Sequence, residues 1–404
     1  MKKPNLYDKL TELSQLAFDS VEKFKQKRFL YSKLEPELKN KSIVILAGPR
    51  GVGKTILLKQ LLKNVSGSFY LSVDQLPPDE SLFQIAKELE LKYKIKNLIL
   101  DEVHYNHNYE TDLKAIYDFL NLKVLVTSSI ALKLEELSID LSRRAHFYQL
   151  FPFSFREFLY FEKGIKILPL TLENLLKKNW QSEHLQHAYL FKDFITGRLY
   201  PFTLDEKSCD ELFKNILEKV VRVDLPQIGK LTTIDILNVE KLLAFIGRSD
   251  SEGISVTSLS KNLAITKYKV EEYLKLLNKA YLIQVVYPRG TNVTKEPKIL
   301  MALPYRLIYR DHIDAVGALR EDFVVETLRA SGLININYLK STRGEKTPDF
   351  IIETLKGREI VIEVGGRGKG RSQFKGINID EKYIFVDSID WSEKQYPLFL
   401  LSMY

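Results

Sequence analysis

The sequence has 404 residues, of which 45% are hydrophobic and 28% charged, with 19 Gly and 14 Pro. This composition is typical of a globular protein of two or three domains and excludes collagen-like, low-complexity and largely disordered classes. Lys and Arg outnumber Asp and Glu by 60 to 52, which fits a nucleic-acid partner but equally fits lysines spread over solvated helix faces.

Cysteine content and apolar runs restrict the environment further. Cys209 is the only cysteine, which excludes an intrachain disulfide and a Cys-based zinc site. No apolar run reaches the about 18 residues that a membrane-spanning helix needs, and the first residues lack the apolar core of a signal peptide. We therefore expect a cytoplasmic protein that does not contact membranes.

Helix-like and strand-like segments alternate over the first third of the chain. Leu16 to Leu34 is predicted as an amphipathic helix, Ser42 to Ala47 as a buried strand, and a helix follows from Thr55. The later strand-like runs are Phe69 to Val73, Leu98 to Leu100, Val124 to Thr127 and Phe147 to Leu150. This alternation predicts a parallel α/β sheet.

A glycine-rich segment follows the first predicted strand. Residues 48–55, GPRGVGKT, match the Walker A pattern G-x-x-x-x-G-K-[ST]. In such a loop the backbone N–H groups surround phosphates, Lys54 places a positive charge on them and Thr55 ligates Mg²⁺. We therefore predict that Mg²⁺ is held by Thr55 and that ATP is bound by Gly48, Pro49, Arg50, Gly51, Val52, Gly53, Lys54, Thr55 and Ile56.

Two carboxylates end the strand-like run NLIL at residues 97–100, as in a Walker B motif. Asp101 is predicted to hold the Mg²⁺ shell and Glu102 to activate the attacking water. Ser128 follows a later strand, where it either senses the γ-phosphate or caps a turn. His104 either orients water or packs beside the site. A glutamate directly after the Walker B aspartate, with a further strand before the polar Ser128, suggests the sheet order 5-1-4-3-2 of additional-strand ATPases.

Arginines near the last core strand are candidates for an arginine finger, a cation that stabilises the transferring phosphate. Arg143 and Arg144 come first, with Arg144 taken as the catalytic candidate, and Arg156 and Arg198 come after them. For each of them, a basic residue on a solvated turn is an equally good interpretation.

The segments GPRGVGKT, ILDEVH, VLVTSS and LSRRAHFYQLFPFSFREFL resemble prokaryotic AAA-type P-loop ATPases, whose core precedes a C-terminal region of unknown function. PFSFREFL, Pro152 to Leu159, is similar to a stretch that this family carries after its final core strand. Phe191 to Phe202 resembles the glycine-containing turn of the family's helical lid. The resemblance implies an ATPase core with a helical lid, arginine fingers from a neighbouring subunit, and hence a homo-oligomer.

A helix, a turn and a second helix are predicted next, over Thr257 to Leu263 and Thr266 to Lys279, with both threonines as N-caps. The strand-like runs Leu282 to Pro288 and Lys298 to Ala302 then complete a winged helix-turn-helix. The side chains placed to contact DNA are Lys267, Tyr268, Lys269 and Arg289. A winged helix that serves only as a spacer between proteins is the competing interpretation.

The last part of the chain suggests a restriction-endonuclease-like fold, with a helix over Arg320 to Ser331 and several strands. Its carboxylates are Glu326, Asp349 and Glu363, but glycine occupies position 365, where an active nuclease needs a lysine. Lys340 and Lys369 are the alternatives, and neither is placed by the sequence. The basic glycine-rich segment from Gly365 to Lys375 either contacts phosphates or is a solvated loop.

We therefore predict an α/β protein with an AAA-type core at residues 1–152, a helical lid at 153–239, a winged helix at 240–310 and a degenerate nuclease-like domain at 311–404. The predicted function is an Mg²⁺-dependent ATPase that switches its C-terminal modules on a DNA or protein partner. Two alternatives remain at this point: an ATP-gated DNA endonuclease, and an ATP-controlled assembly module with negligible hydrolysis.

Overall fold

The computed structural model describes residues 6–130, 141, 144–206, 208–250, 254–290, 296–333, 335–339, 347–354, 356–388 and 390–404. Two compact units divide the chain, Met1–Phe151 and Pro152–Tyr404. Among the described residues, no helix combines the length and the hydropathy needed to cross a lipid bilayer.

A five-stranded parallel sheet forms the centre of the first unit. Its strands are β1 (Ile43–Ala47), β2 (Ser68–Ser72), β3 (Asn97–Asp101), β4 (Lys123–Ser128) and β5 (Ala145–Gln149). They lie in the order β2-β3-β4-β1-β5, which confirms the predicted order 5-1-4-3-2. Every pairing is parallel, so the carboxyl ends of all strands meet at one edge. The residues of β1 and β3 are buried, as expected for strands covered on both faces.

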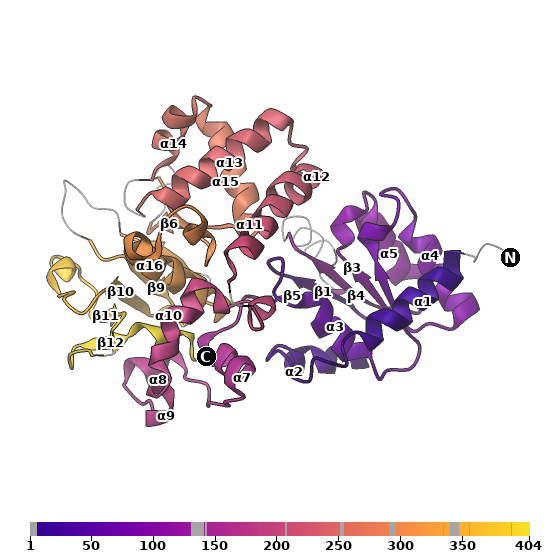
Figure 1. Cartoon of the computed structure of the whole chain (residues 1–404), viewed down its shortest axis with the longest axis horizontal. Coiled ribbons are helices and arrows are strands. Elements are labelled where there is room, and N and C mark those ends of the chain that lie inside the picture. Colours follow the sequence, from indigo (N-terminus) through magenta and orange to yellow (C-terminus); the bar gives the residue numbers. More distant parts are fainter. Residues whose placement is uncertain are drawn as a thin grey trace. The chain divides into compact units, whose positions relative to one another are not determined.

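Helices cover both faces of this sheet (Figure 1), with α4 and α5 on one side and α1 and α3 on the other. Their bounds are α1 (Leu6–Asp19), α2 (Tyr31–Leu34), α3 (Lys54–Leu62), α4 (Leu82–Tyr93) and α5 (Tyr109–Phe119). The predicted helix over Leu16 to Leu34 is wrong. The chain leaves the helix after Asp19, and the buried Arg28 then donates to the carbonyls of Val52 and Phe151.

Short helices open the second unit. They are α7 (Phe155–Lys163), α8 (Leu172–Leu176), α9 (Ser182–Leu185), α10 (Phe191–Asp193), α11 (Asp210–Lys219), α12 (Leu225–Gly229) and α13 (Thr233–Arg248). The described residues of this stretch contain no strand, as predicted. Phe155 packs edge-on against Phe191 and Phe194, which explains why the phenylalanine-rich segment PFSFREFL is buried.

Two helices and a hairpin follow: α14 (Val256–Leu263), α15 (Lys267–Lys279), β6 (Ile283–Pro288) and β7 (Lys298–Met301). Thr266 caps α15 as predicted, because its side chain accepts from the N–H of Lys269. Thr257 is not the cap of α14. Ser255 fills that position, and the Thr257 hydroxyl instead donates to Glu296.

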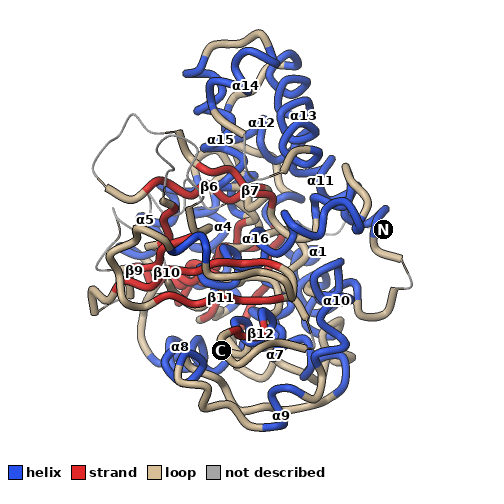
Figure 2. The backbone as a smooth tube through the Cα atoms, turned by 90° about the vertical axis from the view of Figure 1, so that its left-hand side faces the viewer, coloured by secondary structure: helices blue, strands red, loops and turns tan. Residues whose placement is uncertain are grey.

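The chain ends in a mixed sheet that incorporates this hairpin. Helix α16 (His312–Ala330) begins before the predicted start at Arg320. The strands after it are β8 (Ile336–Tyr338), β9 (Phe350–Glu353), β10 (Glu359–Gly365), β11 (Lys382–Val386) and β12 (Gln395–Pro397). The seven strands lie in the order β12-β11-β10-β9-β8-β6-β7. Figure 2 shows the neighbouring strands β10 and β11 of this sheet. Because β6 pairs with β8, the hairpin and the C-terminal segment share one sheet.

Candidate functional site

The Walker A loop joins the carboxyl end of β1 to the first turn of α3. Gly51 and Gly53 have φ values of 88° and 90°, which other L-residues rarely adopt. A Cβ at position 48 would lie 2.1 Å from the carbonyl oxygen of Leu150. The glycines therefore allow the loop to wrap tightly before α3 begins at Lys54, so that N–H groups at the start of this helix are available to an anion.

Lys54 lies across this loop with its ammonium near the Walker B carboxylates. Nζ donates to the carbonyl oxygens of Gly48 at 2.9 Å and Pro49 at 3.1 Å, and lies 3.9 Å from Oε1 of Glu102. The side chain is only 4% exposed. A buried positive charge beside the backbone amides of the loop is suited to polyphosphate binding.

Asp101, at the carboxyl end of β3, is the acceptor for a cluster of hydroxyl groups. Its Oδ2 accepts from Thr55 Oγ1 at 2.8 Å and from the hydroxyl of Tyr70 at 2.7 Å, while Oδ1 accepts from Thr127. Burial and the charge of Glu102 raise the pKa of Asp101, and these hydroxyls oppose the rise. Hydroxyl and carboxylate oxygens are the ligands that Mg²⁺ prefers, so Thr55 and Asp101 fit this ion.

Glu102 is held in a left-handed backbone conformation, with φ of 54°. Its N–H donates to Thr127 Oγ1 at 2.9 Å, and its carboxylate accepts from the N–H of Ser129 at 2.9 Å. Burial opposes ionisation, but the positive charges of Lys54, His104 and Arg50 leave the pKa of Glu102 lowered. Glu102 is therefore ionised at neutral pH, as a proton acceptor must be.

Ser128 and His104 lie beside this carboxylate. Ser128 Oγ lies 3.0 Å from His104 Nδ1, which lies 3.3 Å from Glu102 Oε2. The same Ser128 hydroxyl accepts from the N–H of Ile130 at 3.1 Å and donates to its carbonyl at 3.0 Å. The Ser128 hydroxyl therefore makes the local turn contacts that the sequence suggested, and its alternative role as a sensor of the γ-phosphate stays a prediction.

The arginine candidates do not gather at the Walker A loop of their own chain. Arg144 precedes the amino end of β5, where its carbonyl accepts from the N–H of Ile43, whereas the loop follows the opposite end of β1. It forms an ion pair with Asp118 at 3.2 Å. Arg143 lies outside the described residues. An arginine-finger role for Arg144 would therefore have to be played in a neighbouring copy.

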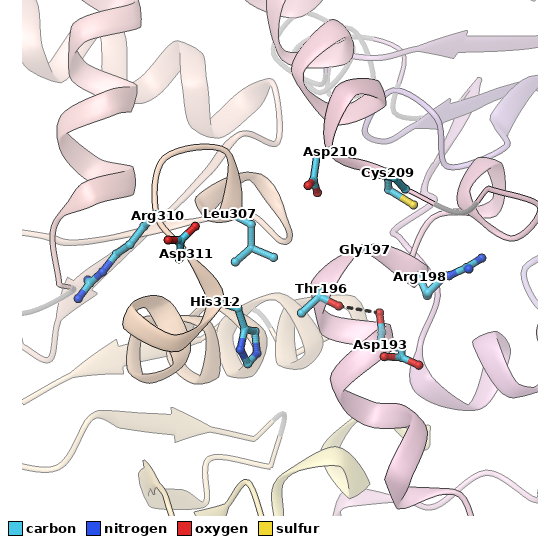
Figure 3. A pocket seen from close by; sticks show the side chains of 11 residues that line it. Asp193, Thr196, Gly197, Arg198, Cys209, Asp210, Leu307, Arg310, Asp311 and His312 are labelled. Carbon is cyan, nitrogen blue, oxygen red and sulfur yellow. Dashed lines mark hydrogen bonds between the residues drawn. The ribbon is translucent and has the colours of Figure 1, made fainter.

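Arg156 and Arg198 bind backbone carbonyls within the second unit. Arg156 donates to Tyr404 at 2.8 Å and to Ile167 at 3.3 Å. Arg198 borders a polar cavity of about 520 Å³ next to α11 and α16 (Figure 3), and it donates to Leu204 at 2.8 Å and to Thr203. Both guanidinium groups therefore have local structural partners.

Two residues near the site, Arg28 and Tyr70, could not be identified from any sequence motif. Arg28 donates to the carbonyl of Val52 in the Walker A loop and, at 2.8 Å, to that of Phe151, so it links the loop to the segment after β5. Tyr70 lies on the edge strand β2 and reaches Asp101. Neither belongs to a motif, and only the pairing of β2 with β3 brings Tyr70 to the site.

The C-terminal carboxylates are only partly arranged as predicted. Asp349 and Glu363 are adjacent, since the N–H of Asp349 donates to Glu363 at 3.3 Å. Lys369 Nζ lies 2.6 Å from Glu363 Oε1, so a lysine from the following loop approaches the glycine position 365. Lys340 lies outside the described residues.

Glu326 is not part of this carboxylate group. It accepts from the N–H of Leu303 at 2.9 Å, and burial raises its pKa to about 8. Glu321, earlier on α16, faces the group instead and forms an ion pair with Lys298 at 2.5 Å. Burial, followed by the charge of Glu321, raises the pKa of Asp349 to about 7. In the part of the chain that the structure describes, no three His, Cys, Asp or Glu side chains gather as a metal site.

The side chains predicted to contact DNA differ in whether they already form ion pairs within the protein. Lys269 is paired with Asp235 at 3.2 Å and with Glu272 at 2.9 Å, and Arg289 is paired with Glu359 at 2.6 Å. Lys267 and Tyr268 are exposed on the first turn of α15. In the glycine-rich segment, Arg367 pairs with Asp390 at 2.7 Å, and Arg371 stacks over Phe374.

Two segments of the chain match known protein families. Residues 40–159 match the family described as AAA domain, and residues 198–302 match the family Domain of unknown function (DUF8612). An uncharacterized protein of Methanocaldococcus jannaschii is 29% identical over 86% of this chain and 82% of its own length. A second one from this organism is 25% identical over 91% of this chain and 85% of its own length.

Solved structures show weaker likeness. The Walker-type ATPase PABY2304 of Pyrococcus abyssi aligns with a TM-score of 0.42 at 18% identity, over 68% of this chain and 93% of that chain. The RuvB Holliday junction branch migration motor of Thermotoga maritima aligns with a TM-score of 0.27 at 14% identity, over 72% and 94%. Since both scores are below 0.5, the assignment rests on the family match and the strand order. Residues 40–159 are therefore similar to the AAA domain family and contain its P-loop and parallel sheet, and an α/β region with a mixed seven-stranded sheet follows them.

Proposed function

We propose that this protein is an Mg²⁺-dependent ATPase whose nucleotide state controls the C-terminal modules on a DNA or protein partner. The observation that carries the ATPase proposal is the contact between Thr55 and Asp101, with Lys54 and Glu102 beside it. These four residues come from two separate motifs and meet at one edge of the sheet. A chance match to the Walker A pattern would give no reason for the Walker B carboxylates to lie beside the loop.

Each residue has a role that follows from its chemistry. Lys54 and the loop amides neutralise phosphate charge, while Thr55 and Asp101 would hold Mg²⁺, which offsets the charge that develops on the phosphate oxygens. Glu102 accepts the proton of the attacking water. Its contacts with Ser129 N–H and His104 fix the direction of the carboxylate before nucleotide arrives.

Replacing Lys54 with Ala should abolish measurable ATP binding without unfolding the chain. The ammonium supplies charge-assisted bonds to phosphate that alanine cannot make, while the glycines that shape the loop stay in place. Calorimetric titration with ATP measures the loss, and circular dichroism checks the fold. Lys63→Ala is the matched control, because Lys63 caps the end of α3 and pairs at the surface with Glu22. Micromolar affinity retained in Lys54→Ala would disprove the Walker A assignment.

The DNA partner is proposed from the excess of basic residues and the exposed first turn of α15. We expect binding of duplex DNA that weakens as salt rises, because phosphate contacts release counterions. Reversing Lys267, Lys269 and Arg289 to Glu should weaken binding further in fluorescence anisotropy. Most of the loss should come from Lys267, since Lys269 and Arg289 already have acidic partners. Absence of salt-dependent binding would favour the protein-spacer alternative, and an unchanged affinity in the triple variant would point to the segment around Arg371.

ATP-gated DNA cleavage is the second candidate, and one observation favours it: Lys369 reaches Glu363 despite the glycine at position 365. We nevertheless expect no cleavage. Lys369 and Lys298 already pair with Glu363 and Glu321, so a metal ion would have to displace both lysines, and the described residues hold no group of three His, Cys, Asp or Glu side chains placed to bind one. Duplex and single-stranded DNA incubated with the protein, ATP and Mg²⁺ or Mn²⁺ should stay intact on a gel. Cutting that disappears in both Asp349→Ala and Lys369→Met would establish the nuclease.

A further inference from the structure

The hydroxyl of Tyr70 belongs to no recognised motif, yet it donates to the same carboxylate as Thr55 does. Tyr70 OH lies 2.7 Å from Asp101 Oδ2, and Thr55 Oγ1 lies 2.8 Å from that oxygen. Thr127 donates to the other oxygen, Oδ1. Both oxygens of Asp101 are thus engaged by hydroxyl donors, and only Thr55 belongs to the Walker A loop.

The ring of Tyr70 packs against the ammonium of Lys59, which lies 4.0 Å from the ring centroid. The backbone N–H of Tyr70 donates separately to Ser14 Oγ of α1 at 2.9 Å. The hydroxyl of Tyr70 is thereby held against Asp101 Oδ2.

We propose that Tyr70 is a positioning residue for the metal: its hydroxyl fixes the Asp101 carboxylate so that Thr55 and Asp101 together bind Mg²⁺. This inference rests on the proposed nucleotide site. Hydrogen bonds to both oxygens hold the Asp101 carboxylate in one orientation. The Thr55 hydroxyl then directs its hydrogen at Asp101, and its lone pairs point away from the carboxylate and stay available for the cation. Groups that orient metal ligands in this way strongly affect metal affinity.

Tyr70→Phe tests the proposal, because it keeps the ring and its contact with Lys59 and removes only the donor. The readout is the affinity of a fluorescent ATP analogue, titrated first in EDTA and then with increasing Mg²⁺. We expect unchanged affinity without metal and a Mg²⁺ half-saturation concentration about tenfold higher, at the lower end of the loss that follows removal of an outer-shell partner. ATP hydrolysis at saturating Mg²⁺ should approach the wild-type rate.

Two control variants separate positioning from packing. Tyr148→Phe also removes a hydroxyl that donates to a carboxylate in this unit, Glu37 at 2.6 Å, and should leave the Mg²⁺ dependence unchanged. Ser14→Ala removes the contact of α1 with the Tyr70 backbone and keeps the Tyr70 hydroxyl, so it should behave like the wild type. Titrations are run well below the melting temperature of each variant, which is measured first.

The possible outcomes are distinct. An unshifted Mg²⁺ half-saturation in Tyr70→Phe would overturn the proposal, and so would an equal shift in Tyr148→Phe or Ser14→Ala. An equal loss of affinity with and without Mg²⁺ would also overturn it, since this pattern indicates a packing role. Failure of the proposed ATPase looks different: the wild-type protein would then bind the analogue without hydrolysing ATP, and the Mg²⁺ titration would still report on Tyr70.

Discussion

Glu102→Gln is expected to bind ATP with near-normal affinity and to hydrolyse it about 10²–10⁴ times more slowly, the usual contribution of a positioned proton acceptor. Glutamine keeps the volume of the side chain and can still accept from the N–H of Ser129, but it cannot take a proton from water. Steady-state phosphate release measures the turnover, and calorimetry measures the retained affinity. The variant should therefore accumulate in the ATP-bound form.

Glu110→Gln is the matched control, because Glu110 is an exposed carboxylate in the first turn of α5. It should hydrolyse ATP like the wild type. Near-normal turnover in Glu102→Gln would assign water activation to another residue. Negligible turnover in the wild-type protein, with a mass in light scattering that follows the nucleotide, would instead favour the assembly module.

Arg306→Met should lower the free energy of unfolding of the second unit by about 3–5 kcal/mol, the usual cost of breaking a buried ion pair from one side. Arg306 and Asp322 are both 0% exposed, and Arg306 Nε lies 2.6 Å from Asp322 Oδ2. The same guanidinium donates to the carbonyls of Ile246 at 3.1 Å and Ser249 at 2.9 Å at the end of α13. The substitution therefore leaves a buried charge and carbonyl groups without their donor.

Arg310→Ala provides the comparison at the surface. Arg310 pairs with Asp250 at 2.6 Å, but Asp250 is 72% exposed, and such pairs contribute about 0–1 kcal/mol. Urea denaturation followed by circular dichroism should separate the two variants clearly. Similar midpoints for both would show that the buried pair contributes no more than an exposed one.

The sequence by itself determined the motifs and caps that depend only on residues close together in the chain. The loop GPRGVGKT needs glycines for its turn and Lys54 for charge, so motif and structure coincide. The apolar strand before Asp101 and Glu102 was equally clear. The glutamate directly after Asp101, with a further strand before Ser128, suggested the sheet order that was found. Thr266 as the cap of α15 belongs to this group, because capping involves only the next turn.

The ends of helices and the ion pairs at the surface could not be predicted from the sequence. The helix predicted to Leu34 ends at Asp19, because the burial of Arg28 against the Walker A loop outweighs the amphipathic pattern. Lys269 has one acidic partner on its own helix, Glu272, but its second partner Asp235 and the partner of Arg289, Glu359, come from other elements. Such pairs join residues far apart in the chain, and no local pattern records them.

Tertiary structure alone decided which side chains meet at Asp101 and Glu363. Tyr70 reaches Asp101 because β2 lies beside β3, although 31 positions separate the two residues. Lys369 reaches Glu363 from the loop after β10, and α16 presents Glu321 in place of Glu326. Motifs record chemistry carried by consecutive residues, whereas these contacts depend on strand pairing and helix rotation, which are fixed only when the apolar faces of the whole unit are buried together.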